Sequence, residues 1–114
     1  MREGDIALSV MPQSDGKIKL RPVLLLRKMP GFGDFLVCGV SSQLHQEVRG
    51  FDLVMDEKSP EYENSGLKSA SVIRLGYLSV LPESKMKGSI GWLPDDTLDM
   101  LLQRLADYLV KTGR

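Results

Sequence analysis

The spacing of the hydrophobic residues changes once along this chain, and that change limits the folds that the chain can adopt. Short runs rich in branched apolar residues come first, and turn residues such as Pro, Gly and Asp separate them. These runs cover residues 5–10, 21–28, 34–41, 50–55, 70–81 and 88–93. After residue 94 the apolar stripe consists of Leu98, Leu101, Leu102, Leu105 and Leu109. Spacings of three and four are typical of an amphipathic helix, so the chain is predicted to form short strands and then one helix.

The predicted helix has a marked beginning. A proline is tolerated at a helix start, and the two carboxylates of Asp95 and Asp96 suit the positive end of the helix dipole. We therefore expect a helix over about residues 95–110. The first three runs predict a meander, and the run 70–81 predicts one long strand or two short strands broken near Gly76. Together they predict a mainly β fold, a small and strongly bent antiparallel barrel with the C-terminal helix packed over it.

The length and composition are those of one globular domain. With 114 residues, 42% hydrophobic and 26% charged, the chain can bury one core but not two domains, and we expect a single domain over residues 1–114. The leucine stripe is expected to be core; the alternative, a partner-binding face, needs a further assumption. No run of eighteen apolar residues and no signal peptide is present, so the sequence predicts a cytoplasmic protein with no membrane span.

Most chemistries that need a metal or a cofactor lack their residues here. The chain has one cysteine and one histidine, so no zinc site is expected, and Cys38 lies among apolar neighbours as a reduced, buried thiol. No phosphate-binding glycine motif is followed by a helix, so no nucleotide cofactor is expected. Ser41, His45 and Asp52 could form a triad on paper, but the chain has no nucleophile elbow, and His45 is expected in a polar loop.

The charges are balanced overall but separate along the chain. Formal net charge is +0, with 15 basic and 15 acidic residues. A basic group consists of Lys17, Lys19, Arg21, Arg27 and Lys28. This group is a candidate anion-binding surface, and the equally simple alternative is the solvated face of a strand. The acidic stretch 56–66 is expected to be a solvated loop.

One arginine is placed where its side chain would be held. Arg21 precedes Pro22 and the apolar run "VLLL", and a proline belongs at the entrance or edge of a strand because it cannot donate to a ladder. A guanidinium fixed there matches phosphate oxygens, and a hydroxyl at the end of the next strand, from Ser41 or Ser42, can donate to the same group. The two strands outline a phosphate site.

An ordered set of short motifs resembles one known family. The motifs are "GDI" (4–6), "RPVLLL" (21–26), "VCGVSSQ" (37–43), "SGLKSASVIRL" (65–75), "IGWL" (90–93) and "LLQRLADYL" (101–109). They are similar to those of the MazF/PemK toxin endoribonucleases of type II toxin-antitoxin systems. The resemblance implies an SH3-like barrel that acts as a homodimer, is inhibited by a cognate antitoxin, and cleaves single-stranded RNA at short motifs without a metal. The nucleophile would be the RNA 2′-hydroxyl, and the product a cyclic phosphate.

The resemblance also implies roles for individual residues. Arg21 would neutralise the scissile phosphate in the transition state and Ser41 would hydrogen-bond it, so these two are the expected catalytic residues. The other expected contacts with RNA are Lys17, Lys19, Ser42 and Gln43. Loops beside the site would read the RNA bases, with Phe32 and the 43–49 loop as candidates.

The chain departs from the family pattern at Gly76 and Tyr77, where many members carry polar or acidic residues near the cleft. An alternative function is therefore a catalytically inactive barrel that binds RNA or a protein partner.

Overall fold

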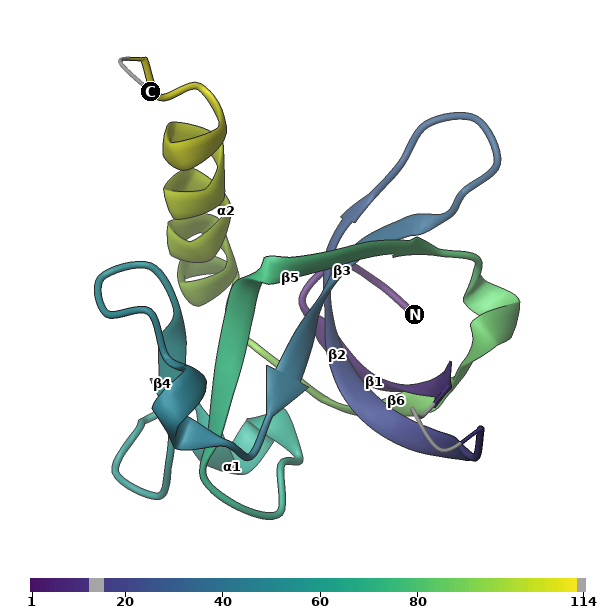
Figure 1. Cartoon of the computed structure of the whole chain (residues 1–114), viewed down its shortest axis with the longest axis horizontal. Helices are drawn as coiled ribbons and strands as arrows, with labels where there is room; N and C mark the ends of the chain where they lie inside the picture. The colour runs from purple at the N-terminus through teal and green to yellow at the C-terminus, as the bar shows by residue number, and fades with distance from the viewer. Residues whose placement is uncertain (13–15, 113–114) are drawn as a thin grey trace.

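The computed structural model of this chain describes residues 1–12 and 16–112. Within these residues, six strands form one antiparallel sheet in the order β4-β5-β3-β2-β1-β6. The strands are β1 (Asp5–Pro12), β2 (Ile18–Lys28), β3 (Phe35–Ser41), β4 (Leu53–Met55), β5 (Ser71–Leu81) and β6 (Met86–Trp92). The helices are α1 (Tyr62–Ser65) and α2 (Asp95–Leu109), with 3₁₀ turns at Leu44–Gln46 and Glu83–Lys85. Figure 1 shows the sheet curled into a half-barrel, with α2 standing beside it.

The predicted fold class is confirmed, and so is the meander of the first three strands, since β1 pairs with β2 and β2 with β3. β5 is one long strand, which settles the choice left open at residues 70–81. The fourth strand is shorter than predicted because a turn precedes it: the N–H groups of Phe51 and Asp52 both donate to the Val48 carbonyl. The turn predicted around residues 13–15 lies outside the described residues.

The sheet buries apolar side chains on both faces. The helix-side core includes Leu24, Leu26, Cys38, Val40, Ile73 and Leu75 from the sheet and Leu98, Leu101 and Leu105 from α2. The second core, on the other face, consists of Ala7, Val23, Leu25, Phe35, Val37 and Met86. Successive strand residues point to opposite faces, so the run "VLLL" supplies both cores in turn. This double burial explains why the run is apolar without alternation.

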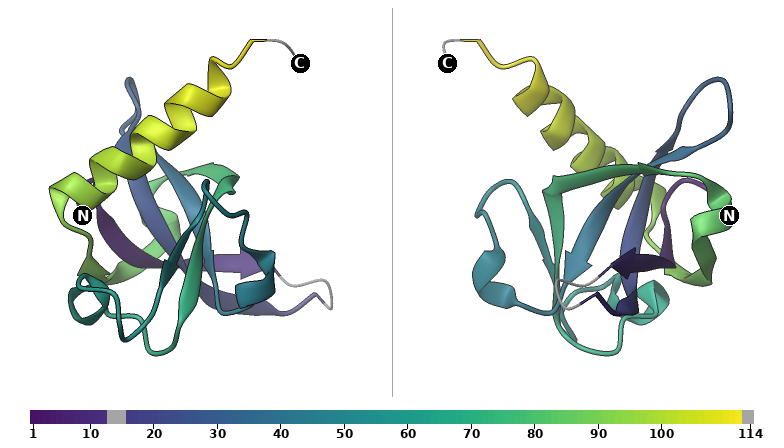
Figure 2. Two further views of the ribbon diagram at one scale, coloured as in Figure 1. Left: turned by 90° about the vertical axis from the view of Figure 1, so that its left-hand side faces the viewer. Right: turned by 45° about the vertical axis from the view of Figure 1, so that its right-hand side comes forward.

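The α2 helix packs on the sheet through its N-terminal part only. Leu98, Leu101 and Leu105 are buried, whereas Leu102 is half-buried and Leu109 is 67% exposed. The prediction that Leu109 belongs to the core is therefore wrong. Figure 2 shows the reason, because the C-terminal end of the helix extends past the sheet. Within the described residues, neither helix is long and apolar enough to cross a membrane.

The acidic stretch, expected to be a solvated loop, contains α1 and is docked on the sheet. The helix ends at Gly66, which adopts a left-handed conformation with φ of 73°. A Cβ added at Gly66 would collide with the backbone of Ile90, and one added at Gly91 would collide with the backbone of Asn64 and Ser65. Two motifs far apart in the sequence thus meet backbone to backbone, which only glycines permit.

Candidate active site

The strands β2 and β3 separate near one end of their ladder. Their pairing runs from Lys28–Phe35 to Val23–Gly39, where it ends in the described structure. Continuing the same register by two positions would set Arg21 opposite Ser41. On its other side β2 remains paired with β1, with Pro22 opposite Leu8 and Arg21 opposite Ser9.

Pro22 therefore lies inside a central strand, and the prediction of a strand entrance or edge is wrong. The proline is nevertheless next to the point where the ladder with β3 ends, and a residue without an N–H cannot extend that ladder as a donor. β1 holds this part of β2 instead. The proline correctly indicated that β2 lacks a backbone donor at this position, but not that the strand would continue beyond it.

The space between the diverging strands is a cleft of about 330 Å³. Four of the six expected site residues line it, namely Arg21, Ser41, Ser42 and Gln43. Residues two positions apart on a strand point to the same face, as do Arg21 and Val23 on β2 and Gly39 and Ser41 on β3. Val23 belongs to the second core, so the cleft lies on the face of that core. The polar cleft therefore lies directly beside the apolar second core.

The Ser41 side chain is held in a defined position at the end of β3. Its Oγ accepts a hydrogen bond of 3.0 Å from the backbone N–H of Gln43. This local bond is typical of Ser and Thr at turns, and it compensates for the rotamer-locking methyl group that a threonine would have. Because the oxygen acts as acceptor in this bond, the hydroxyl hydrogen remains available for a ligand.

Gln46, Arg74 and Tyr77 also line the cleft. Gln46 lies in the loop expected beside the site and Tyr77 at a position expected near the cleft, whereas Arg74 was not expected from the sequence. Gln46 follows Gln43 in the predicted 43–49 loop, and its buried Oε1 has no hydrogen-bond donor among the described residues. Arg74 could have been suspected, because it is a cation within the apolar run "SVIRL" and is only half-buried. It lies opposite Gly39 in the ladder between β3 and β5.

A bend in β5 brings these residues to the cleft. The register with β3 shifts between Gly39–Arg74 and Cys38–Leu78, so residues 75–77 bulge out of the ladder. The N–H of Leu75 donates instead to Oδ1 of Asp52, at 3.0 Å. Oδ2 of the same carboxylate accepts from the Val48 N–H at 2.9 Å. A buried carboxylate therefore fixes the bulge.

Tyr77 is the last residue of the bulge and covers Gly39. A Cβ added at Gly39 would collide with Cδ2 of the Tyr77 ring, so the ring occupies the space that any other residue's side chain would fill. The guanidinium carbon of Arg74 lies 5.2 Å from the centre of the same ring, within the range of a cation–π contact. The ring is still 51% exposed.

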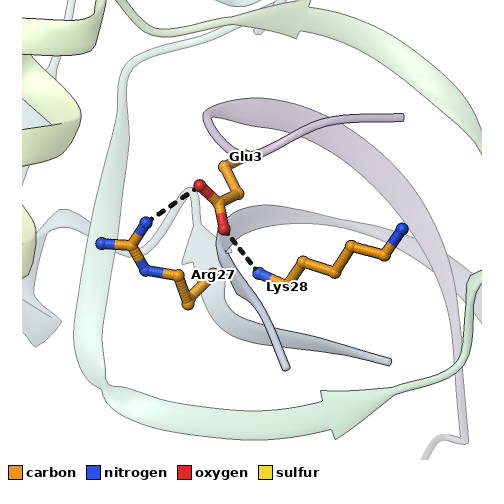
Figure 3. Close-up of polar contacts among 3 residues, drawn as sticks. All are labelled: Glu3, Arg27 and Lys28. Atoms are coloured by element: carbon orange, nitrogen blue, oxygen red, sulfur yellow. Dashed lines mark hydrogen bonds and ion pairs between the residues drawn. The ribbon is translucent and has the colours of Figure 1, made fainter. Parts of the chain in front are cut away.

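The basic group of the sequence is divided in the structure. Lys17 and Lys19 are exposed at the beginning of β2, outside the cleft lining. Arg27 and Lys28 are at its other end, where Glu3 holds them (Figure 3): Oε1 of Glu3 accepts from Arg27 at 3.0 Å, and Oε2 accepts from the Lys28 backbone N–H at 2.8 Å. A single basic surface from all five residues is therefore not formed.

Phe32 does not lie beside the cleft. It is 98% exposed in the turn after the far end of β2, whereas Arg21 lies near the beginning of that strand. The expectation that Phe32 belongs to a loop next to the site is wrong. The 43–49 loop does reach the cleft, through Gln43 and Gln46.

The triad considered from the sequence is not assembled. Asp52 is committed to two backbone N–H groups, and His45 is exposed and does not line the cleft. Cys38 is fully buried, and burial followed by the charge of Asp52 raises the pKa of its thiol to about 12. Within the described residues, no three His, Cys, Asp or Glu side chains cluster as metal ligands would.

Comparison with protein families gives a match over nearly the whole chain. Residues 2–109 match the model of the PemK-like, MazF-like toxin of type II toxin-antitoxin systems. The chain belongs to the PemK/MazF toxin family. Members of this family are endoribonucleases that work with an antitoxin partner, so an RNA substrate is the family's substrate class. The alternative of an inactive barrel is not favoured by this match.

The fold of this PemK/MazF member agrees with a solved relative. The chain is similar to the Mycobacterium tuberculosis toxin MazF-mt6, with 21% identity, a TM-score of 0.64, and coverage of 96% of this chain and 99% of the other. At this identity the likeness concerns the fold. A search of curated proteins found no match.

Proposed function

We propose that this PemK/MazF member is a sequence-selective endoribonuclease that cleaves single-stranded RNA in the cleft between β2 and β3. The observation that carries the proposal is that Arg21 and Ser41 line one cleft, beside a sheet that is buried on both faces. The family supplies the reaction class, and this geometry supplies a binding site for a phosphodiester.

Arg21 acts by charge. Attack of the RNA 2′-hydroxyl on the adjacent phosphorus builds negative charge on the phosphate oxygens, and a guanidinium beside them stabilises that charge more in the transition state than in the ground state. An arginine hardly deprotonates, so it is not the base that takes the 2′-hydroxyl proton. The reaction forms a new P–O bond to the 2′-oxygen and breaks the P–O bond to the 5′-oxygen. The 2′-hydroxyl proton is lost to solvent and the departing 5′-oxygen takes up a proton from solvent, which leaves a 2′,3′-cyclic phosphate and a 5′-hydroxyl end.

Ser41 and its neighbours position the RNA. The Ser41 hydroxyl, already an acceptor for the Gln43 N–H, donates to a phosphate oxygen, and Ser42 and Gln43 lie beside it on the same wall. The Gln46 amide can read a base edge, as amides commonly do in single-stranded RNA. Lys17 and Lys19 contact the RNA backbone further along β2, where they are exposed.

We further infer from the family that the single domain acts as a cytoplasmic homodimer and that no metal takes part in the reaction. Light scattering on the purified protein gives the mass of the assembly directly. A monomer that cleaves RNA at full rate would overturn the dimer.

The decisive experiment compares Arg21→Ala with wild type on a long, mixed-sequence single-stranded RNA in the presence of a chelator, with the new 5′ ends sequenced. Removing one prearranged charged donor is expected to lower the rate by about 10²- to 10³-fold. Arg27→Ala is the matched control, since this arginine is on the same strand but pairs with Glu3 at the other end. Its exposed ion pair contributes little, so it should cleave like wild type.

Three results would contradict the proposal. If folded wild type makes no discrete cuts, the protein is a silent binder. If the chelator stops the cuts, or if Arg21→Ala and Arg27→Ala lose activity equally, the phosphate site is not the one described.

A further inference from the structure

Tyr77 lines two cavities of different character. On one side is the polar cleft with Arg21 and Ser41. On the other side is a smaller groove of about 150 Å³, lined mainly by the apolar side chains of Val23, Val37, Leu78 and Leu81. Tyr77 and Gly39 belong to the walls of both. Such a pair of neighbouring sites suits a nucleic acid strand, in which charged phosphates alternate with bases that have flat, stackable faces.

The position of the ring is determined by its surroundings. The bulge at residues 75–77 projects Tyr77 over the sheet, the missing side chain of Gly39 leaves room for it, and Arg74 stacks over it at 5.2 Å. A side chain already held in this way loses little conformational freedom when a ligand binds. With 51% of its surface exposed, the ring can still be contacted.

We propose that Tyr77 is the stacking surface for one nucleobase adjacent to the phosphate bound by Arg21, and that it sets the preference for the base at that position. This inference rests on the proposed function and adds a specificity residue to it. Base stacking on tyrosine is a general mode of single-strand recognition, and the apolar groove accepts the base while the polar cleft holds its phosphate. Arg74 and Gly39 are positioning residues for the ring.

The test compares the cleavage maps of three variants. Tyr77→Ala should raise KM about tenfold, with a smaller change in kcat, and should make the base at one position beside the cut indifferent; stacking losses of this size are typical for single-stranded ligands. Tyr77→Phe keeps the ring and should restore the base preference. Phe32→Ala removes an aromatic ring that is outside both cavities and should leave the map unchanged.

A second pair of variants tests the positioning without altering the ring. Gly39→Ala should displace Tyr77 and reproduce the loss of base preference, because the new methyl group would collide with Cδ2 of the ring. Gly76→Ala is the matched control on the bulge itself, since its Cβ would come only within 3.9 Å of Phe51. A merely structural role for Tyr77 would change thermal stability in the Gly39→Ala protein but not the identity of the cleaved sequences.

The outcomes separate this inference from the proposed function. If wild type cuts and Tyr77→Ala cuts the same sequences with the same KM, the stacking surface is refuted while the ribonuclease stands. If wild type does not cut, binding of an uncleavable 2′-deoxy oligonucleotide decides: weaker binding by Tyr77→Ala but not by Tyr77→Phe supports the stacking surface. Equal binding by wild type, Tyr77→Ala and Tyr77→Phe, or no binding by wild type, overturns the stacking surface.

Discussion

Replacement of Asp52 should lower the free energy of unfolding by more than the removal of an exposed carboxylate does. The carboxylate is 5% exposed and accepts two backbone hydrogen bonds, from Leu75 and from Val48. Leu75 is fully buried, and its N–H is left without the β3 partner by the bulge. Asp52→Ala would therefore leave one N–H unsatisfied in the interior, at about 1–3 kcal/mol, and one at the surface, where water can replace the carboxylate.

The expected loss of unfolding free energy is about 3 kcal/mol for Asp52→Ala. Asp52→Asn keeps one acceptor for the Leu75 N–H and should lose only about 1 kcal/mol. For a domain of this size each kcal/mol lowers Tm by about 4 °C, so the two variants should melt about 12 °C and 4 °C below wild type.

Scanning calorimetry measures these differences directly, with Glu57→Ala as the control that removes the same charge from an exposed site. The control should stay within about 0.5 kcal/mol of wild type. If Asp52→Ala melts no lower than Glu57→Ala, the carboxylate does not hold the bend in β5, and the account of how Arg74 and Tyr77 reach the cleft is wrong.

Three further predictions concern the core. Burial raises the pKa of the Cys38 thiol from 9.0 to about 12, so the free energy of unfolding should fall by about 1.4 kcal/mol per pH unit between pH 9 and 12 and should not depend on this thiol below about pH 9. Cys38→Ala should lack this fall when urea unfolding is measured over the same pH range. Gly91→Ala should cost about 3 kcal/mol or more by urea unfolding, because its methyl group would meet the backbone of α1, and an unchanged midpoint would contradict that contact. Leu101→Asp should abolish folding as judged by near-UV circular dichroism, whereas Leu109→Asp on the exposed end of α2 should fold normally; the reverse order would place the wrong part of the helix against the sheet.

Local patterns in the sequence were sufficient for the elements and for the class of fold. The short branched apolar runs bounded by turn residues and the spacing of three and four after residue 94 depend only on neighbouring residues, and they correctly predicted the meander and the start of α2. The same patterns failed at the end of α2, because a helix stripe continues through Leu109 whether or not the sheet extends far enough to cover it. The spacing of apolar residues predicts which face of a helix they occupy, but not whether another element covers that face.

The site was only partly accessible from the sequence for the same reason. Arg21 lies in the first half of β2 and Ser41 at the end of β3, and the two strands are neighbours in a meander, so their proximity follows from local connectivity. Arg74 and Tyr77 enter the cleft only because β5 pairs with β3 and bulges there. Gly76 marked a possible break within residues 70–81, but the residues around it do not show that Asp52, 23 positions from Leu75, holds the bulge there.

The sequence by itself determined the order of the strands and of α2, the buried apolar run "VLLL", and the burial of Cys38. That this run is buried on both faces was decided by the sheet that surrounds it. The tertiary structure alone decided that the basic group divides, because Glu3 reaches Arg27 across 24 positions, and that Gly66 meets Gly91. It also decided that Tyr77 lines both a polar and an apolar cavity. These features depend on contacts between residues remote in sequence, whose partners are selected by the packing of the whole sheet and not by the residues beside them.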